Sequence, residues 1–278
     1  MRVLPALENI FYGANLSNIL SAHKSVVLDV LACLPYGIFH FGAPFICALS
    51  LFVYAPPTTV AVFARCFGYA NLLGVVIQIL FPCSPPWYEN LYGLAPANYS
   101  MQGSPAGLAR IDQLFGVDLF TSTFTASPLV FGAFPSLHAA NATLEALFMS
   151  HVFPRAKPIF IAYVLWLWWA TMYLSHHYAV DLVGGSLLSG VAFYYTKSKY
   201  LPRVQMDKAT RWDYDYVEVG DVPTQPGYDL AHLDTLGPDT DDWTVGSSSS
   251  ISSGSMSPAD EAHPPWRESY AIGERWVA

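Results

Sequence analysis

Two short strings in this chain hold residue types that could do chemistry: FPSLH (134–138) and HHYAVD (176–181). Between them lie two apolar segments, joined by the basic turn PRAKP (154–158). About 16 residues lead from His138 to the turn and about 19 lead back, which corresponds to roughly 24 and 28 Å at helical rise. Both lengths are close to the thickness of one hydrocarbon core. We therefore expect His138 and His177 to lie at the same depth, on the same side of a membrane.

The spacing of His177 and Asp181 indicates a nucleophilic histidine. The two residues are four apart, which places them one turn apart on the same helix face. A carboxylate there can accept a hydrogen bond from one ring nitrogen, which sets the tautomer and leaves the other nitrogen's lone pair free. His138, from the neighbouring helix, could then protonate a leaving oxygen and later take a proton from an acceptor.

Helix N-termini add to this expectation. Ser136 has the residue type and position of an N-cap, with His138 in the first turn that follows, and Ser175 or His176 opens the last apolar segment. Both N-termini are then expected to point at one spot. Because helix N-termini favour anions and disfavour protonated imidazole, the pattern predicts phosphoryl transfer through a phosphohistidine, with no metal required.

Two other interpretations of these residues stay open. A histidine near a membrane face is often structural, with its polar tip directed to the interface. A metal site is also conceivable, since His138, His177 and Asp181 could supply two imidazoles and one carboxylate. Membrane oxidases with such ligands need many more clustered histidines, and His40 and His151 lie elsewhere in the chain.

The composition indicates a membrane-embedded body followed by a polar tail. Of the 278 residues 53% are hydrophobic and only 12% are charged, and 14 of the 21 acidic residues follow Tyr200. The net charge of −8 therefore belongs mostly to the tail, and it argues against a nucleic-acid partner. The four cysteines form no metal-binding pattern. We expect Cys33, Cys47 and Cys66, which lie in apolar stretches, to be small buried hydrophobes, whereas Cys83 lies in a predicted loop and could be free or paired.

The apolar segments predict an all-α membrane bundle of about five transmembrane helices. We expect a membrane domain over 34–200, an N-terminal lumenal or interfacial segment over 1–33, a lumenal loop over 82–130, and a disordered cytosolic tail over 201–278. Basic residues in the 154–158 turn and after the last segment place both in the cytosol, so the two histidines face the lumen. The predicted helices cover 34–54, 60–81, 137–153, 159–174 and 178–196.

The strings also carry a family resemblance. FPSLH and HHYAVD resemble the second and third motifs of the type 2 phosphatidic acid phosphatase superfamily, whose fold is a polytopic helix bundle. Over about two hundred residues, the chain more closely resembles the fungal inositol phosphorylceramide synthases. The strings that carry this likeness are LPALEN (4–9), PYGIFHF (35–41), SPPWY (84–88), LYGLAPANY (91–99), GSPAGLARID (103–112), GAFPSLH (132–138) and TMYLSHHY (171–178).

The resemblance implies a reaction and a place. Members of that family transfer phosphoinositol from phosphatidylinositol to ceramide in the Golgi membrane, with the active site in the lumen, without a cofactor, and with a small regulatory membrane subunit as a possible partner. Carried over by motif, His177 is the nucleophile, Asp181 orients it, and His138 is the acid and base. A lipid phosphate phosphatase of the same superfamily and a catalytically inactive membrane scaffold remain as alternatives.

The chain departs from the superfamily pattern in its cations. It has no clear match to the first motif, and Thr171 stands where an arginine is usual. Synthases of this type also lack these cations, which favours a synthase over a phosphatase. We expect Arg110, Ser136 and His176 to contact the substrate, although Arg110 could equally be a plain interfacial arginine. Because family members carry further N-terminal spans, we expect the chain to be an N-terminally truncated fragment.

Overall fold

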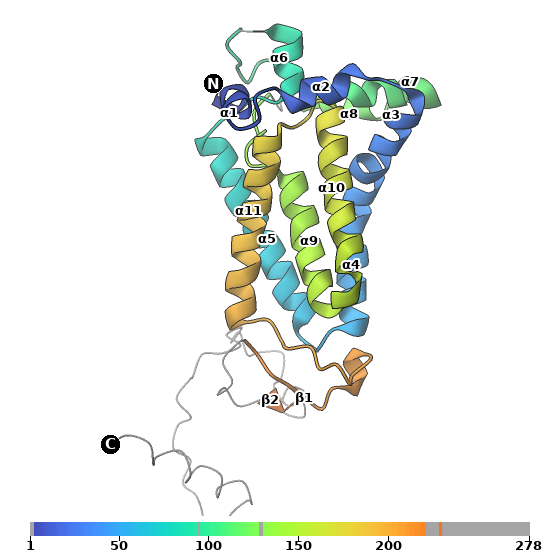
Figure 1. The fold of residues 1–278 in the computed structure, drawn as a ribbon, viewed down its shortest axis with the longest axis vertical. Helices are drawn as coiled ribbons and strands as arrows, with labels where there is room; N and C mark the ends of the chain where they lie inside the picture. Colours follow the sequence, from blue (N-terminus) through green and yellow to red (C-terminus); the bar gives the residue numbers. More distant parts are fainter. Residues whose placement is uncertain (1–2, 94, 128–129, 221–227, 230–278) are drawn as a thin grey trace, which may run out of the picture. The chain divides into compact units, whose positions relative to one another are not determined.

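Five long helices run side by side in the computed structural model, which describes residues 3–93, 95–127, 130–220 and 228–229 (Figure 1). The central one is α9, which packs against each of the other four. Its position explains why a motif at its start can meet residues from several elements. The five helices are α4 (His40–Tyr54), α5 (Thr59–Leu80), α9 (Leu137–Val152), α10 (Lys157–Tyr173) and α11 (Ala179–Lys199).

The helical part of the prediction is confirmed: the last four predicted segments each coincide with one of these helices to within about three residues at either end, and the first ends with α4 at Tyr54. The first of them is longer than expected, because α3 (Val26–Cys33) runs through the π-turn η1 (Leu34–Phe39) into α4. Two helices, Val26–Tyr54 and Thr59–Leu80, are long and apolar enough to cross a membrane by length and composition. That α9, α10 and α11 also cross it remains a prediction, as do the predicted domain borders.

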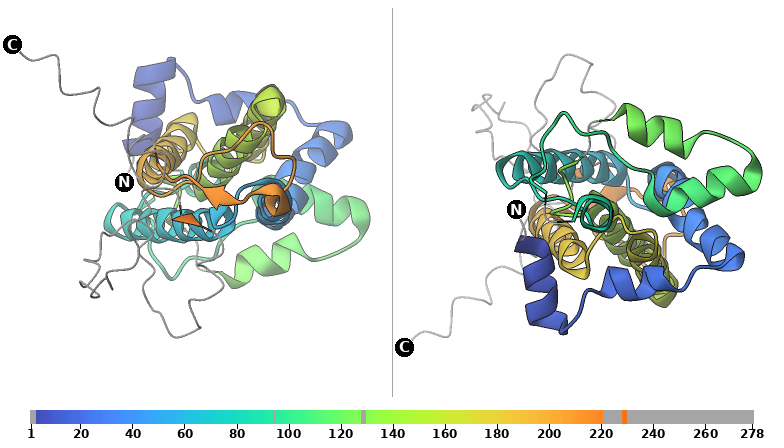
Figure 2. Two further views of the ribbon diagram at one scale, coloured as in Figure 1. Left: turned by 90° about the horizontal axis from the view of Figure 1, so that it is seen from below. Right: turned by 90° about the horizontal axis from the view of Figure 1, so that it is seen from above.

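Short helices gather at the end of the bundle where α9 and α11 begin (Figures 1 and 2). The prediction had only an interfacial segment and a loop here. Hydrogen bonds tie these elements to the corner that follows α10: the Ser17 hydroxyl donates to the Met172 carbonyl at 2.8 Å, and the Trp87 amide donates to the Ser175 carbonyl at 2.9 Å. The helices are α1 (Val3–Tyr12), α2 (Leu16–Ala22), α6 (Pro86–Tyr92), η2 (Ala106–Leu108), α7 (Ala109–Phe115) and α8 (Phe120–Ala126).

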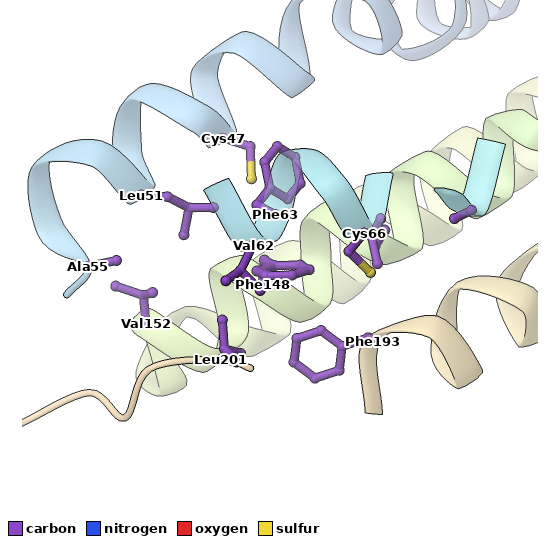
Figure 3. Packing of buried hydrophobic residues seen from close by; sticks show 12 residues of the cluster. Cys47, Leu51, Ala55, Val62, Phe63, Cys66, Phe148, Val152, Phe193 and Leu201 are labelled. Atoms are coloured by element: carbon purple, nitrogen blue, oxygen red, sulfur yellow. The ribbon is translucent and has the colours of Figure 1, made fainter. Parts of the chain in front are cut away.

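The opposite end of the bundle is held by an apolar core (Figure 3). All four cysteines are free and buried, and two of them belong to this core, in agreement with the expected role as small hydrophobes. The core consists of Cys47, Leu51, Ala55, Val62, Phe63, Cys66, Ala70, Leu144, Phe148, Val152, Phe193 and Leu201.

Residues 201–220, the first part of the predicted tail, pack against the end of the bundle. Leu201 is buried in the apolar core, and the Arg203 amide donates to the Glu218 carbonyl at 2.8 Å. An apolar side chain directly after α11 is enough to turn the chain back over the bundle end. This stretch contains η4 (Arg211–Asp213) and the two-residue strand β1 (Tyr216–Val217), which pairs with β2 (Tyr228–Asp229). The short helix η3 (Pro154–Ala156) forms the turn between α9 and α10. Residues 221–227 and 230–278 lie outside the described ranges.

Glycine lets α9 and α11 approach closely at their first turns. A Cβ added to Gly185 would lie 2.1 Å from the Ser136 carbonyl oxygen, a distance that no side chain tolerates. One turn further, the Ser189 hydroxyl donates to the Ala140 carbonyl at 2.6 Å. Small residues that permit such contact are a common device in membrane helix packing. The close approach brings the starts of the two helices, and their histidines, together.

Candidate active site

The predicted carboxylate and histidine pair is present. The Nδ1 atom of His177 lies 2.9 Å from Oδ2 of Asp181, and the same oxygen accepts the amide N–H of Tyr178 at 3.0 Å. Both side chains are buried, Asp181 completely. Because an ionised carboxylate is an acceptor only, Nδ1 of His177 carries the hydrogen and Nε2 carries the lone pair. His177 is therefore in the tautomer that a nucleophile at Nε2 requires.

The second histidine meets the first, as the hairpin argument predicted. His138, at the second position of α9, places its Nδ1 3.1 Å from Nε2 of His177. With the tautomer of His177 set by Asp181, the hydrogen of this bond belongs to His138. A phosphorus atom attacked by Nε2 has to displace that hydrogen bond. The displaced N–H of His138 is then close to the leaving oxygen, where a general acid is needed.

The start of α9 has room for an anion. The Ser136 hydroxyl accepts the amide N–H of Ala139 at 3.3 Å, which confirms it as the N-cap. The amide N–H groups of Leu137 and His138 have no acceptor among the described residues. Free N–H groups in the first turn of a helix favour a phosphate oxygen. The contact of Ser136 itself with a substrate remains a prediction.

The start of α11 is already occupied, which corrects the expectation that both N-termini are open to phosphate. The amide N–H of Tyr178 binds Asp181, and those of Ala179 and Val180 bind the carboxylate of Glu8 at 3.2 and 3.1 Å. Carboxylates of the protein have thus taken the anion position of this helix. Of these two helix starts, that of α9 is the one with unpaired backbone N–H groups in the described structure.

Arg110 is paired within the protein. Its Nε lies 2.9 Å from Oδ2 of Asp29, whose Oδ1 also accepts the hydroxyl of Tyr173 at 2.8 Å. The hydrogen bonds that Arg110 donates to Asp29 raise the pKa of Arg110 above its usual value. In the described structure Arg110 makes no hydrogen bond or ion pair with His138 or His177. Its predicted contact with phosphate remains untested.

His176 also has a partner within the protein. Its Nε2 lies 3.2 Å from the Pro105 carbonyl, so this nitrogen carries a hydrogen, and its ring stacks on Tyr36 with centroids 5.0 Å apart. Burial lowers the pKa of His176 to about 3, which keeps the imidazole neutral. These contacts indicate that His176 holds the 103–108 loop in place; the predicted contact with substrate is untested.

Three neighbours of the site escaped the sequence reasoning. The ring of His40 lies with its centroid 4.5 Å from that of His138, and Tyr36 stacks on His138 at 4.6 Å. His40 thus belongs to the site, contrary to the statement that it lies elsewhere. The third neighbour is Glu8. All three lie within strings that carry the family resemblance (4–9 and 35–41), which was the available signal, although spacing gave them no role. The metal interpretation gains no support, since no group of three potential ligands was found among the described residues.

Comparisons with known proteins identify the family that this chain resembles. The family model described as "PAP2 superfamily" matches residues 3–195. The inositol phosphorylceramide synthase catalytic subunit of Schizosaccharomyces pombe is 59% identical over 217 residues, which are 78% of this chain and 51% of that protein. The corresponding catalytic subunit of Saccharomyces cerevisiae is 54% identical over 242 residues, 87% of this chain and 58% of the relative.

A third relative, the inositol phosphorylceramide synthase of Candida albicans, is 54% identical over 222 residues, 80% of this chain and 47% of its own length. The chain thus spans about half the length of the curated relatives it matches. The family match covers well over half of the chain, including all the residues of the site. The chain belongs to the PAP2 superfamily.

Proposed function

We propose that this chain carries the catalytic site of an inositol phosphorylceramide synthase, which transfers phosphoinositol from phosphatidylinositol to ceramide. The observation that carries the proposal is the continuous line from Asp181 through His177 to His138, with hydrogen bonds of 2.9 and 3.1 Å. Similarity to three proteins named for this activity supports the choice of substrates.

In the first step, Nε2 of His177 attacks the phosphorus of phosphatidylinositol. His138 enters this step as the imidazolium, with both ring nitrogens protonated. A P–N bond forms, the P–O bond to the diacylglycerol oxygen breaks, and that oxygen takes the Nδ1 proton of His138, which becomes a neutral imidazole. Asp181 stabilises the positive charge that develops on the His177 ring, because its carboxylate accepts the Nδ1 hydrogen. Diacylglycerol leaves, and phosphoinositol stays on His177.

In the second step, His138 removes the proton from the primary hydroxyl of ceramide. The ceramide oxygen attacks phosphorus, the P–N bond to His177 breaks, and inositol phosphorylceramide is released. His138 has then regained the proton that it lost, and His177 its lone pair. A cofactor is not needed at either step.

The non-bridging oxygens of the phosphoryl group need donors during both steps. We assign this role to the amide N–H groups of Leu137 and His138 at the start of α9, since they are the free backbone donors beside the reacting histidines. Arg110 remains a second candidate, provided that a phosphate competes with Asp29 for its guanidinium.

The proposal includes a location. We place the protein in the Golgi membrane, with the histidines on the lumenal side and the C-terminal tail in the cytosol. The basic residues at the opposite end of the bundle, in the 154–158 turn and after α11, support this orientation. A small regulatory membrane subunit is the expected partner, and its contact surface is not identified.

An acceptor assay tests the function. Membranes containing the chain receive phosphatidylinositol labelled in its inositol, with and without ceramide. A labelled sphingolipid that forms only with ceramide supports the transferase. Release of labelled inositol phosphate without ceramide identifies a hydrolase of the same superfamily instead. Absence of both products, from chain that is shown to be folded, leaves the inactive scaffold.

A further inference from the structure

The N-terminal helix α1 reaches the active site through one side chain. Glu8 is completely buried, although it lies 171 residues before the residue that it binds. One carboxylate oxygen accepts the amide N–H of Ala179 at 3.2 Å, and the other accepts that of Val180 at 3.1 Å. Figure 1 shows α1 beside the start of α11, at the end of the bundle that holds the histidines.

Helix α11 needs this contact because its own N-cap cannot supply it. The N-cap position holds Tyr178, whose hydroxyl is directed to Glu89 at 3.1 Å. A serine or aspartate at that position would accept an N–H of the first turn. The amide groups of Ala179 and Val180 are the first two of the helix and have no intrahelical partner. Glu8 therefore acts as a cap supplied by a distant helix.

The contact is directly linked to the reacting groups. Val180 precedes Asp181, whose Oδ2 holds both His177 and the Tyr178 amide. The other oxygen of Asp181 is buried without a hydrogen-bond partner in the described structure. Because this oxygen makes no hydrogen bond, the orientation of the Asp181 carboxylate depends on the position of the backbone at the start of α11. Glu8 fixes that backbone.

The burial of Glu8 is unfavourable for its charged form, and its hydrogen bonds to the protein offset this cost. Burial raises the pKa of Glu8, and the negative charge of Asp181 adds to this, while the two amide N–H groups act in the opposite direction. A carboxylate is a costly choice in a fully buried position unless its hydrogen bonds are needed there.

We propose that Glu8 is a positioning residue: it holds the first turn of α11 so that Asp181 keeps Nδ1 of His177 bonded and directs Nε2 toward phosphorus. The proposal rests on phosphoryl transfer by His177, as in the proposed function, but not on the identity of the two lipids. It also assigns the N-terminal helix a part in catalysis, in addition to its packing on the bundle.

The test compares Glu8→Gln with Ser17→Ala in the full chain, in membranes and in detergent. Glutamine keeps the size of the side chain but has one acceptor oxygen, so one amide of α11 loses its partner. Ser17→Ala removes another buried tether of the N-terminal region, and the Met172 carbonyl that loses it still accepts the Ser175 amide. The control therefore disturbs the same end of the bundle without touching α11.

We expect Glu8→Gln to lower kcat by about 10-fold to 100-fold, as loss of outer-shell partners does elsewhere, with KM for phosphatidylinositol changed less than about threefold. Ser17→Ala should leave kcat within about twofold. Equal losses in the two variants, or a Glu8→Gln enzyme with wild-type kcat, would overturn the proposal.

A second measurement does not depend on the lipids. Orthovanadate mimics a phosphoryl group in transfer, and its Kd is obtained from the rise of Tm with vanadate concentration. Glu8→Gln should weaken vanadate binding about tenfold in the wild-type background but not in Asp181→Asn, because both changes act on the same histidine. Additive losses would contradict the proposal.

The vanadate result also separates the two proposals. A wild-type chain that binds vanadate but makes no labelled sphingolipid, while Glu8→Gln weakens the binding, retains Glu8 as a positioning residue and refutes the synthase. A folded wild-type chain that neither binds vanadate nor transfers phosphoinositol contradicts both.

Discussion

The starts of α9 and α11 lie side by side, yet they are used in opposite ways. At α11 the protein's own carboxylates, Glu8 and Asp181, occupy the amide N–H groups. At α9 the Ser136 hydroxyl binds only one, and the amides of Leu137 and His138 remain free. Under the proposed function, the protein fixes one N-terminus so that it orients the nucleophile, and the other N-terminus is available to a phosphate. The two histidine-containing strings, 134–138 and 176–181, both begin a helix, but the two helix starts have different hydrogen-bond partners.

The largest effect is expected at the nucleophile on the fixed side. His177→Ala removes the atom that attacks phosphorus, so transfer should fall by at least about 10⁴-fold. Labelled sphingolipid formation in membranes measures this, with the amount of folded chain determined by thermal unfolding. Full activity in the variant would end the enzyme interpretation and, with it, the contrast between the two helix starts.

The second prediction concerns a substitution that should move the starts of α9 and α11 apart. Gly185→Ala places a methyl group 2.1 Å from the Ser136 carbonyl, so α9 and α11 have to move apart. We expect about 1–3 kcal/mol of destabilisation from overpacking and at least a tenfold loss of activity, since the His138–His177 distance increases.

Gly190→Ala is the matched control, because it lies on the same helix and its added Cβ meets nothing within 4 Å. That variant should keep its activity and be as stable as the wild type, or up to about 1 kcal/mol more stable. Tm and activity of both variants, measured together, check the pair. Similar behaviour of the two variants would show that the close approach at Gly185 is not needed.

A smaller effect is expected on the open side. Ser136→Ala removes the cap of α9 and should cost about 1 kcal/mol of stability. Because a third amide at the start of α9 then lacks its partner, the geometry offered to phosphate loosens, and we expect KM for phosphatidylinositol to rise a few-fold. Steady-state kinetics measure this effect. Ser136→Thr, which keeps the hydroxyl, should restore the wild-type value.

The last prediction concerns the effect of pH on stability through His176, and no change of activity is expected near neutral pH. The pKa of His176 is lowered to about 3 in the folded chain, whereas an exposed histidine titrates near 6.5. As pH falls below about 6.5, the unfolded chain binds a proton that the folded chain does not, so stability from His176 is complete above that pH and declines below it.

At pH 5 the loss from this group is about 2 kcal/mol. His176→Gln keeps a donor for the Pro105 carbonyl and does not titrate, so any Tm deficit of the variant relative to wild type should shrink between pH 8 and pH 5. A deficit that is the same at both values would show that His176 does not contribute to acid sensitivity. Thermal unfolding in detergent is the measurement.

Much of the site was predictable because it depends on local spacing. His177 and Asp181 are joined by one helical turn, and His138 lies at the other end of the hairpin formed by α9 and α10, two helix lengths back along the chain. Such distances follow from helical rise alone. The helix limits were predictable for a similar reason: continuous apolar runs end at Pro57, at Pro82 and at the basic turn.

The partners that come from far along the chain were not predictable. Spacing carries no signal that Glu8 binds Val180, that Asp29 neutralises Arg110, or that His40 lies against His138, because each contact joins elements separated by about 80 residues or more. From residue types alone, we expected Arg110 to contact the substrate and the N-terminus of α11 to be available to a phosphate. The tertiary structure decided otherwise, since burial makes it costly to leave a charged group or an amide without a partner, and the nearest partner in space is set by how the helices pack.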